Sequence, residues 1–286
     1  MAQPAPSPLA ACDDGAPPPP GWALDETPVP ESTLHDQILL LVRLLWLAWL
    51  VREERAAYVA HNLALRFWAA RPEVGLDPDL ALYEPPPPRV AKLRSVRTWR
   101  PGHAPPKVAL EVVSKNHPTK DYRLAPAKYD ASGTGELWVF DPLLAGPREG
   151  GGPYRLQLWA RGPGGRLERL YAGEGPVRSP FFGAWLVVVD EEEGGLRLRL
   201  SDDPKGRRRW PTPEEAERQA KEAERRAKAE AEARAEAERA AKEAERRAKE
   251  AAEQKAEAEQ RAKDEALAEL ARLREEVARL REGKAG

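Results

Sequence analysis

Residues 107–113 read Lys-Val-Ala-Leu-Glu-Val-Val, an apolar run with a single carboxylate, Glu111, in its middle. Its composition predicts a β-strand, and because side chains alternate across a strand, Glu111 shares its face with Val113 and not with Val112. A carboxylate in such a run is costly to bury unless a cation, a metal ion or hydrogen bonds compensate its charge. Glu111 is therefore either a salt-bridged strand residue or part of a functional site.

A second carboxylate opens another short strand. Residues 77–83 read Asp-Pro-Asp-Leu-Ala-Leu-Tyr, which places Asp79 immediately before an apolar run. Two strands that carry acids at one edge of a sheet predict a site for a divalent metal ion, since Mg²⁺ prefers carboxylate oxygens. Asp77 is an alternative ligand, and Asp79 has the alternative role of capping the turn after Pro78.

The overall composition does not indicate what the protein binds, but the charge of one segment is informative. Among 286 residues, Lys+Arg 46 and Asp+Glu 47 nearly cancel, so net charge indicates no class of partner. From Arg89 to Lys128, ten basic residues are opposed by Glu111 and Asp121 alone, an excess that suits a phosphate-binding surface or a set of solvated loop side chains. A single cysteine, Cys12, excludes an internal disulfide and favours a cytoplasmic protein.

The N-terminal third combines a Pro-rich leader with an apolar helix. Residues 1–30 are rich in Pro, Ala and Gly and are predicted to be disordered. Ser32 or Thr33 caps a predicted helix over residues 34–54, where His35 has either a capping role or a position near an active site. Arg43 interrupts the apolar run, which is shorter than the roughly 20 residues of a membrane span, so we expect a buried core helix and no membrane partner.

The remaining globular sequence predicts an α/β domain over residues 31–204. A strand over residues 58–68 precedes the two acidic strands, and a helix over residues 119–132 ends at Gly133, which suits a helix C-terminus. Strand, helix and the strand at 137–140 in this order indicate an α/β crossover. Further strands, more consistent with antiparallel pairing, are expected at 154–159, 167–171, 185–189 and 196–200.

After a linker at 205–211, the sequence changes to a helical tail over residues 212–284. Thr212, Pro213 and Glu215 form a strong helix start. The tail consists almost entirely of Ala, Glu, Lys, Arg and Gln, with alanines in alternating four- and three-residue steps and a Leu/Val seam at residues 270–280. This heptad spacing predicts a coiled coil for self-association or for a protein partner, or a solitary rod where alanine alone forms the seam.

Several motifs occur together in the order typical of one known family. They comprise Glu31–Gln37, Asn62–Leu63, Pro78–Asp79, Leu110–Lys115, Asp121, Tyr129 and Glu136–Pro142. In this order and spacing the chain resembles the Uma family of restriction endonucleases, within the PD-(D/E)xK nuclease superfamily, from about Glu31 to Pro204. The resemblance implies a restriction-endonuclease-like fold, a mixed sheet flanked by helices, and metal-dependent hydrolysis of DNA phosphodiester bonds.

The resemblance also implies roles for individual residues. Asp79 matches the PD aspartate and Glu111 the (D/E) position, and both are expected to hold Mg²⁺ or Mn²⁺, with the backbone carbonyl of Val112 or Val113 as a further ligand. The motif's lysine position is occupied by Val113, and the alternative position on the following helix by Ala125. Lys128, one helical turn beyond Ala125, and Lys115, just past the strand, are the replacements that the sequence offers.

Two functions follow from these features. The first is a metal-dependent DNA endonuclease whose helical tail dimerises it or recruits a partner. The second is a degenerate nuclease fold without activity, assembled through its coiled coil, for which Val113 and Ala125 are the evidence. His61, His103 and His117 lack the spacing of metal ligands. Trp99 and Trp138 are interpreted as core or loop anchors rather than as platforms for base stacking.

Overall fold

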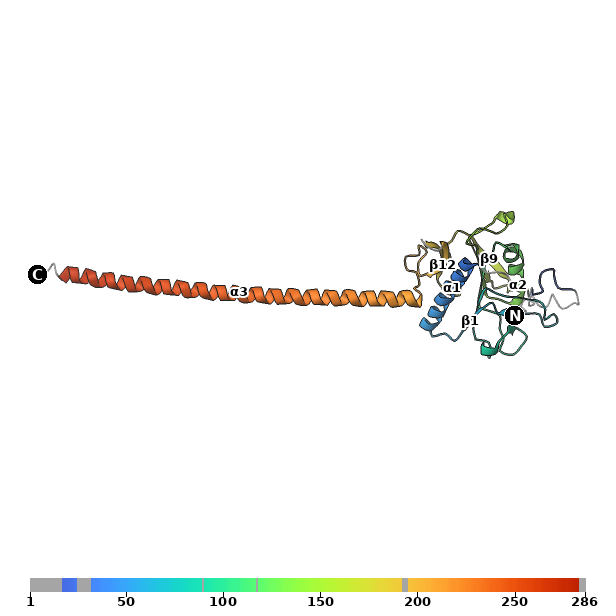
Figure 1. Ribbon diagram of the computed structural model, residues 1–286, viewed down its shortest axis with the longest axis horizontal. Helices are drawn as coiled ribbons and strands as arrows, with labels where there is room; N and C mark the ends of the chain where they lie inside the picture. Colours follow the sequence, from blue (N-terminus) through green and yellow to red (C-terminus); the bar gives the residue numbers. More distant parts are fainter. Residues whose placement is uncertain (1–16, 25–31, 89, 117, 192–194, 283–286) are drawn as a thin grey trace. The chain divides into compact units, whose positions relative to one another are not determined.

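The computed structural model describes residues 17–24, 32–88, 90–116, 118–191 and 195–282 (Figure 1). The chain divides into two compact units, Met1–Ala216 and Glu217–Gly286. Most of the leader that was expected to be disordered lies outside the described residues. Its described part, residues 17–24, contains a turn and an isolated β-bridge between Ala23 and Val74.

The first unit combines two α-helices, three short helical segments and twelve strands among its described residues. The helical elements are α1 (Thr33–Arg52), the 3₁₀ segments η2 (Val90–Lys92) and η4 (Glu149–Gly151), the π-helical segment η3 (Lys120–Leu124) and α2 (Ala125–Ser132). The strands are β1 (Tyr58–His61), β2 (Ala64–Arg66), β3 (Gly75–Leu76), β4 (Leu80–Tyr83), β5 (Ser95–Arg97), β6 (Val108–Val112), β7 (Glu136–Phe140), β8 (Leu156–Arg161), β9 (Leu167–Gly173), β10 (Val177–Arg178), β11 (Trp185–Glu191) and β12 (Gly195–Ser201).

The largest sheet is mixed, with six strands in the order β1-β4-β6-β7-β8-β9. Only β6 and β7 run parallel, joined by the crossover through η3 and α2, and the other neighbours are antiparallel. Two three-stranded sheets accompany it, in the orders β10-β11-β12 and β3-β2-β5. The predicted α/β fold with a mixed sheet is therefore confirmed.

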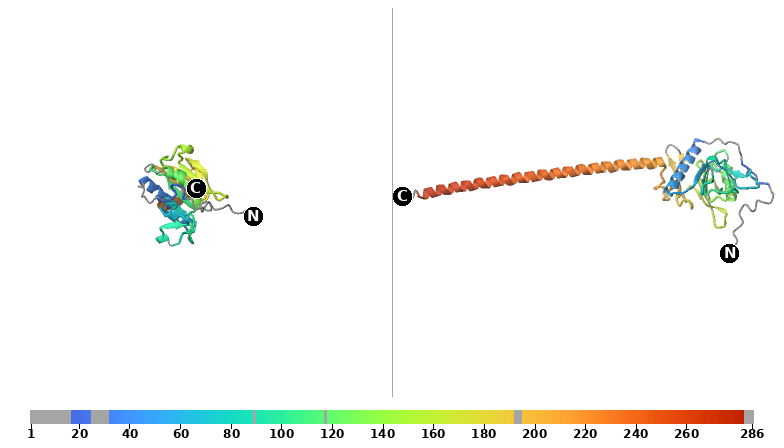
Figure 2. Two further views of the ribbon diagram at one scale, coloured as in Figure 1. Left: turned by 90° about the vertical axis from the view of Figure 1, so that its right-hand side faces the viewer. Right: turned by 90° about the horizontal axis from the view of Figure 1, so that it is seen from below.

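Alternation along the central strands divides the interior into two hydrophobic cores. In β6, Leu110 and Val112 face the core that contains α1, whereas Ala109, and Val113 just after the strand, face the core that contains α2. Figures 1 and 2 show α1 and α2 on opposite sides of the strands. Glu111 therefore lies on the α2 side of the sheet, which is the side where Tyr129 packs.

Helix α1 packs as a core helix. By length and composition it could cross a membrane, but Trp46 is fully buried, and its ring meets the rings of Trp138 and Phe182 at centroid distances of 5.3 and 5.6 Å. Its N-terminus is capped as the sequence suggested, since the Ser32 hydroxyl accepts the backbone N–H of His35 at 3.2 Å. This packing explains the apolar run by burial against the sheet.

Two predicted elements differ in detail from the structure. The strand predicted over residues 58–68 is two strands, β1 and β2, which belong to different sheets. They separate at Asn62, whose φ of 48° lies in the left-handed region that asparagine tolerates better than most residues. The helix predicted over residues 119–132 is interrupted after its first residues by the π-helical η3 and continues as the α-helical α2 from Ala125.

Residues 205–211, expected as a linker, form a bonded turn. The Trp210 ring is 5% exposed and lies 6.2 Å from Phe182, and its Nε1 donates to Asp202 Oδ1 at 2.7 Å. At Thr212 the predicted capping box is present, because the Glu215 N–H bonds to the threonine hydroxyl and the Thr212 N–H bonds to the Glu215 carboxylate.

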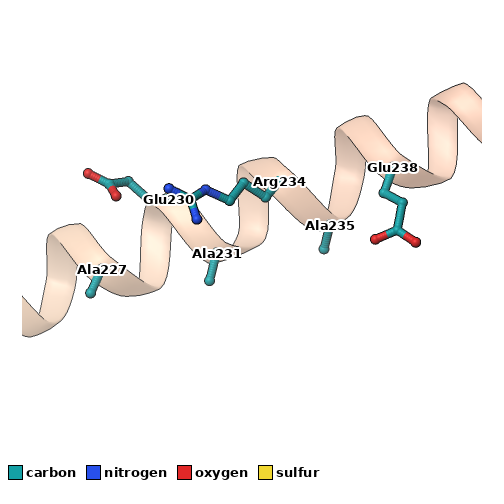
Figure 3. A pocket seen from close by; sticks show the side chains of 6 residues that line it. All are labelled: Ala227, Glu230, Ala231, Arg234, Ala235 and Glu238. Carbon is teal, nitrogen blue, oxygen red and sulfur yellow. The ribbon is translucent and has the colours of Figure 1, made fainter.

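Helix α3 (Pro213–Glu282) extends through the second unit. Every residue from 217 to 277 is exposed. In the stretch of Figure 3, Ala227, Ala231 and Ala235 point to one side of the helix. Pairs at (i, i+4) such as Glu217–Lys221 and Glu238–Lys242, each at 2.6 Å, support the helix along its surface. The predicted long helix is confirmed.

Candidate active site

The antiparallel pairing of β4 and β6 places the two predicted acids side by side. Leu80 pairs with Leu110, and continuing this register by one residue places Asp79 opposite Glu111. Opposed residues of antiparallel strands lie roughly 4.5–5.5 Å apart at their Cα atoms and project to the same face. The strand edge also fixes the aspartate, because the Val112 N–H donates to Asp79 Oδ2 at 2.7 Å.

Glu111 is a buried acid at the centre of a group of carboxylates. It is 4% exposed, and Tyr129 donates its hydroxyl to Glu111 Oε1 at 2.5 Å. Burial raises the pKa of Glu111 well above its usual value, and the charges of Asp79 and Asp121 raise it further. Lys120 and the Tyr129 hydrogen bond act in the opposite direction. The protein therefore holds this carboxyl where its negative charge is unfavourable.

A third acid joins this group from the crossover. Asp121 lies in η3, is 6% exposed, and has its pKa raised to about 7 by burial and by Asp79. Lys120 and His35 lower that pKa in part. A π-helical turn inserts an extra residue in the helix ladder and is frequent at functional sites. Here it carries Lys120 and Asp121, the two charged residues that act most directly on the strand acids.

Lys120 is the cation that the structure associates with the acids. Its pKa is raised, first by Glu111 and then by Asp121, Asp79 and Asp77, while burial acts against them. Part of the side chain remains exposed. The sequence offered Lys120 only as one of the basic residues between 89 and 128. Its position directly before Asp121, at the start of the crossover helix, is the signal that could have identified it.

Helix α1 contributes a histidine to the same acids. His35 Nε2 lies 3.5 Å from Asp79 Oδ2, and the two side chains are 11% and 17% exposed. Of the two roles considered for His35, the position near the acids is the one that the structure shows for its side chain, while Ser32 provides the cap.

Comparison with known proteins places this site in a family. The family model of Uma2, described as "Putative restriction endonuclease", matches residues 21–170, more than half of the chain. The chain belongs to the Uma2 family. The fold and the family expected from the sequence are thus confirmed, and the family description is that of a nuclease.

One solved structure similar to this chain is a "putative nuclease belonging to DUF820" from Anabaena variabilis ATCC 29413. It has 16% sequence identity and a TM-score of 0.37, and the match covers 56% of this chain and 78% of that chain. No curated protein matches the chain.

The two lysine positions of the Uma2-like motif are part of the hydrophobic core here. Val113 is 2% and Ala125 is 5% exposed, and both belong to the core on the α2 side. Lys115 is exposed in the bend after β6. Lys128 is 6% exposed and donates its ammonium group to the carbonyl of Gly21 at 3.0 Å. Burial and Lys120 lower the pKa of Lys128 to about 8, while Glu111 raises it in part.

The carboxylate oxygens of Asp79 and Glu111 are suitable ligands for a hard divalent cation. Among the described residues no group of three or more His, Cys, Asp or Glu side chains has the arrangement of a complete metal site. However, the β4–β6 register, continued by one residue, places Asp79 opposite Glu111, and the charge of Asp79 raises the pKa of Glu111. One or two carboxylates completed by water are a common ligand set for Mg²⁺. The pKa values of Glu111 and Asp121 are raised, and a cation bound between the acids would lower them.

Proposed function

We propose that this protein is a metal-dependent endonuclease that hydrolyses phosphodiester bonds of DNA, with Asp79 and Glu111 as the metal ligands. The observation that carries the proposal is their juxtaposition: two acids on adjacent strands, on one face, with Asp121 close enough to raise the pKa of Glu111. Three acids with mutually unfavourable charges are the environment that a divalent cation stabilises. Membership of the Uma2 family supports the same reaction class.

The chain's own residues would hold and orient this site. Asp79 is held by the Val112 N–H, and Glu111 by the Tyr129 hydroxyl, so neither carboxylate is free to rotate away from the other. A bound Mg²⁺ or Mn²⁺ would supply the positive charge that polarises the phosphodiester group and favours ionisation of water. His35, which lies at Asp79 Oδ2, would restrict the aspartate from the α1 side.

Lys120 is the residue we assign to the role of the motif lysine. An ammonium group beside the reacting phosphate stabilises the negative charge that develops in the transition state. The charges of Glu111, Asp121 and Asp79 raise the pKa of Lys120, whereas Lys128 donates to Gly21 and Lys115 lies in the bend beyond the strand. The predicted candidates Lys128 and Lys115 therefore rank after Lys120.

The test is cleavage of supercoiled plasmid in the presence of Mg²⁺ or Mn²⁺. We expect nicking or linearisation by the wild type and none by the Asp79→Ala/Glu111→Ala double variant. Lys120→Ala should lose roughly 100-fold or more in rate, on the scale of one lost charge-stabilising group. Lys115→Ala is the matched control and should cleave as the wild type does. Equal rates for Lys120→Ala and the wild type would exclude the lysine assignment.

A second candidate is a degenerate nuclease fold that serves as an interaction module. The burial of Val113 and Ala125 at the usual lysine positions favours it. It predicts no cleavage with either metal on plasmid or single-stranded DNA, by the wild type or any variant. That outcome would refute the endonuclease.

For the tail we propose parallel, in-register self-association near its C-terminus. Leu270, Leu273 and Val277 have three- and four-residue spacing and are 45%, 55% and 47% exposed. In this heptad Glu269 and Arg274 occupy the flanking g and e positions, where they would form an ion pair between two parallel copies.

Sedimentation equilibrium of the full chain tests the tail. We expect a dimer for the wild type and a monomer for Leu270→Glu/Leu273→Glu. Glu275→Ala, on the outer helix face, should leave the mass unchanged. A wild-type monomer at high micromolar concentration would refute self-association.

A further inference from the structure

From residue 85 to the start of β6, every Asp, Glu, Lys or Arg position is occupied by Lys or Arg. No Asp or Glu occurs between residues 85 and 110, whereas the described part of this stretch contains five basic residues. They are Lys92, Arg94, Arg97, Arg100 and Lys107. We refer to residues 92–107 as the cationic loop; it includes β5 and the turns that follow it.

The positive charges of the cationic loop are largely uncompensated by protein. Lys92, Arg94, Arg100 and Lys107 are exposed, and within the described parts of the chain none of them forms an ion pair. Arg97 donates its Nε to Ser95 Oγ at 3.2 Å, which leaves the guanidinium charge without a carboxylate. A surface of this kind attracts anions, and most strongly those with regularly spaced charges.

Two further observations show that like charges are held together here. Arg97 of β5 pairs directly with Arg66 of β2, although like charges opposite each other destabilise a sheet. The pKa of His103, which accepts the Arg97 N–H at Nδ1, is lowered by burial and then by Arg100 and Arg97. Both observations indicate a positive potential on this side of the loop. A bound polyanion would relieve it.

A tryptophan lies among these charges. Trp99 follows β5 in the turn between Arg97 and Arg100 and is 37% exposed. Among the described residues its ring packs against no other aromatic ring and has no cation above it. The Trp49 ring, in contrast, packs against Phe181 and Phe182 and has the Arg55 guanidinium above it. An exposed indole between arginines is the combination that binds single-stranded nucleic acid, since a base stacks on the ring while the phosphates meet the cations.

We propose that the cationic loop binds single-stranded DNA, with an unpaired base stacked on Trp99 and the neighbouring phosphates on Arg94, Arg97 and Arg100. The inference rests on the proposed function, because the bound strand is the substrate of the proposed site at Asp79 and Glu111. Lys107 ends the loop four residues before Glu111, which corresponds to about 13 Å along the strand.

The test is fluorescence anisotropy of the full wild-type chain with a labelled 20-nucleotide single strand and with the matched duplex, in EDTA so that no cleavage occurs. We expect Trp99→Ala to weaken single-strand binding roughly tenfold or more, the scale of one lost stacked base, and to affect the duplex less. Trp99→Phe should retain most of the affinity, because it retains an aromatic face. Leu143→Ala, another exposed apolar residue, is the control.

The charge contribution is measured separately. Arg94→Gln and Arg100→Gln should each lower the slope of log Kd against log salt by about 0.7, the value for one phosphate contact on a single strand. Arg208→Gln, an exposed arginine outside the loop, should leave the slope unchanged. An RNA strand of the same sequence that binds tighter than DNA would overturn the choice of DNA.

The possible outcomes distinguish a failure of this inference from a failure of the proposed nuclease activity. Wild-type affinity in Trp99→Ala, or an equal loss for single strand and duplex, refutes the stacking site even where plasmid cleavage is observed. Binding that depends on Trp99 without any plasmid cleavage supports the loop and refutes the chemistry. No measurable binding of single-stranded DNA by the wild type refutes the inference outright.

Discussion

The raised pKa of Asp121 predicts a pH dependence of stability with an unusual sign. Its carboxyl titrates near pH 7 in the folded chain and at about 3.9 in the unfolded chain. A carboxyl whose pKa is raised by folding is protonated in the native state over the interval between these values. The contribution of this carboxyl to the free energy of unfolding is therefore fully present below about pH 4 and is lost as the pH rises through 7.

The magnitude follows from the size of the shift. About three pKa units at roughly 1.4 kcal/mol per unit correspond to a loss of about 4 kcal/mol between pH 4 and pH 8. Asp121→Asn has nearly the same shape and no ionisation. The free energy of unfolding of the variant minus that of the wild type should therefore increase by about this amount across the same range, measured in EDTA.

Urea unfolding followed by tryptophan fluorescence is suited to this measurement. All nine tryptophans lie between residues 22 and 210, so the signal reports the first unit and not the tail. Glu168→Gln, an exposed acid on β9, is the control and should follow the wild type. Millimolar Mn²⁺ at pH 8 should restore part of the wild-type stability. A variant-minus-wild-type difference that is constant from pH 4 to pH 8 would show that folding does not raise the pKa of Asp121, and would refute the repulsion on which the metal site is argued.

Two further predictions concern neighbouring features. Tyr129→Phe removes the hydrogen bond that stabilises ionised Glu111. Calorimetric titration at pH 6.5 should therefore show weaker Mn²⁺ binding than in the wild type, with the difference decreasing toward pH 8.5. An unchanged affinity at both pH values would contradict this role. Trp46→Ala, which empties a fully buried position between Trp138 and Phe182, should cost about 3–5 kcal/mol in urea unfolding, and Leu47→Ala, 37% exposed, much less; equal costs would contradict the packing of α1 against the sheet.

The parts of the fold that depend on local periodicity could be predicted from sequence. Alternation identified Glu111 on the face opposite Val112, and the capping residues at Thr212 identified the start of the long helix. The strand over residues 58–68 could not be divided correctly, because strand composition continues through Asn62 while the backbone turns there. A single left-handed residue leaves little trace in a pattern of apolar side chains.

The lysine could not be predicted for a related reason. The sequence argument counted positions along a regular helix from Asp121 and arrived at Ala125 and Lys128. The crossover instead contains a π-helical turn over Lys120–Leu124, in which residue spacing and facing differ from those of an α-helix. The charge of Glu111 is the largest cause of the raised pKa of Lys120, the residue that precedes the aspartate, and no regular spacing indicates this residue.

The energetics of the acids bear on the choice between an active nuclease and a degenerate fold. Glu111 and Asp121 are both nearly buried, and each has its pKa raised by Asp79 as well as by burial. A chain that needed only the fold would gain stability by replacing one of them with a neutral residue, since burying like charges is unfavourable. Functional sites are where such unfavourable arrangements persist, because activity requires them. The loss of the usual lysines at Val113 and Ala125 argues for degeneration only if no other ammonium group acts on the acids, and the charge of Lys120 lowers the pKa values of both Glu111 and Asp121. The buried acids together with the charge of Lys120 therefore support the proposed hydrolytic site over the degenerate fold.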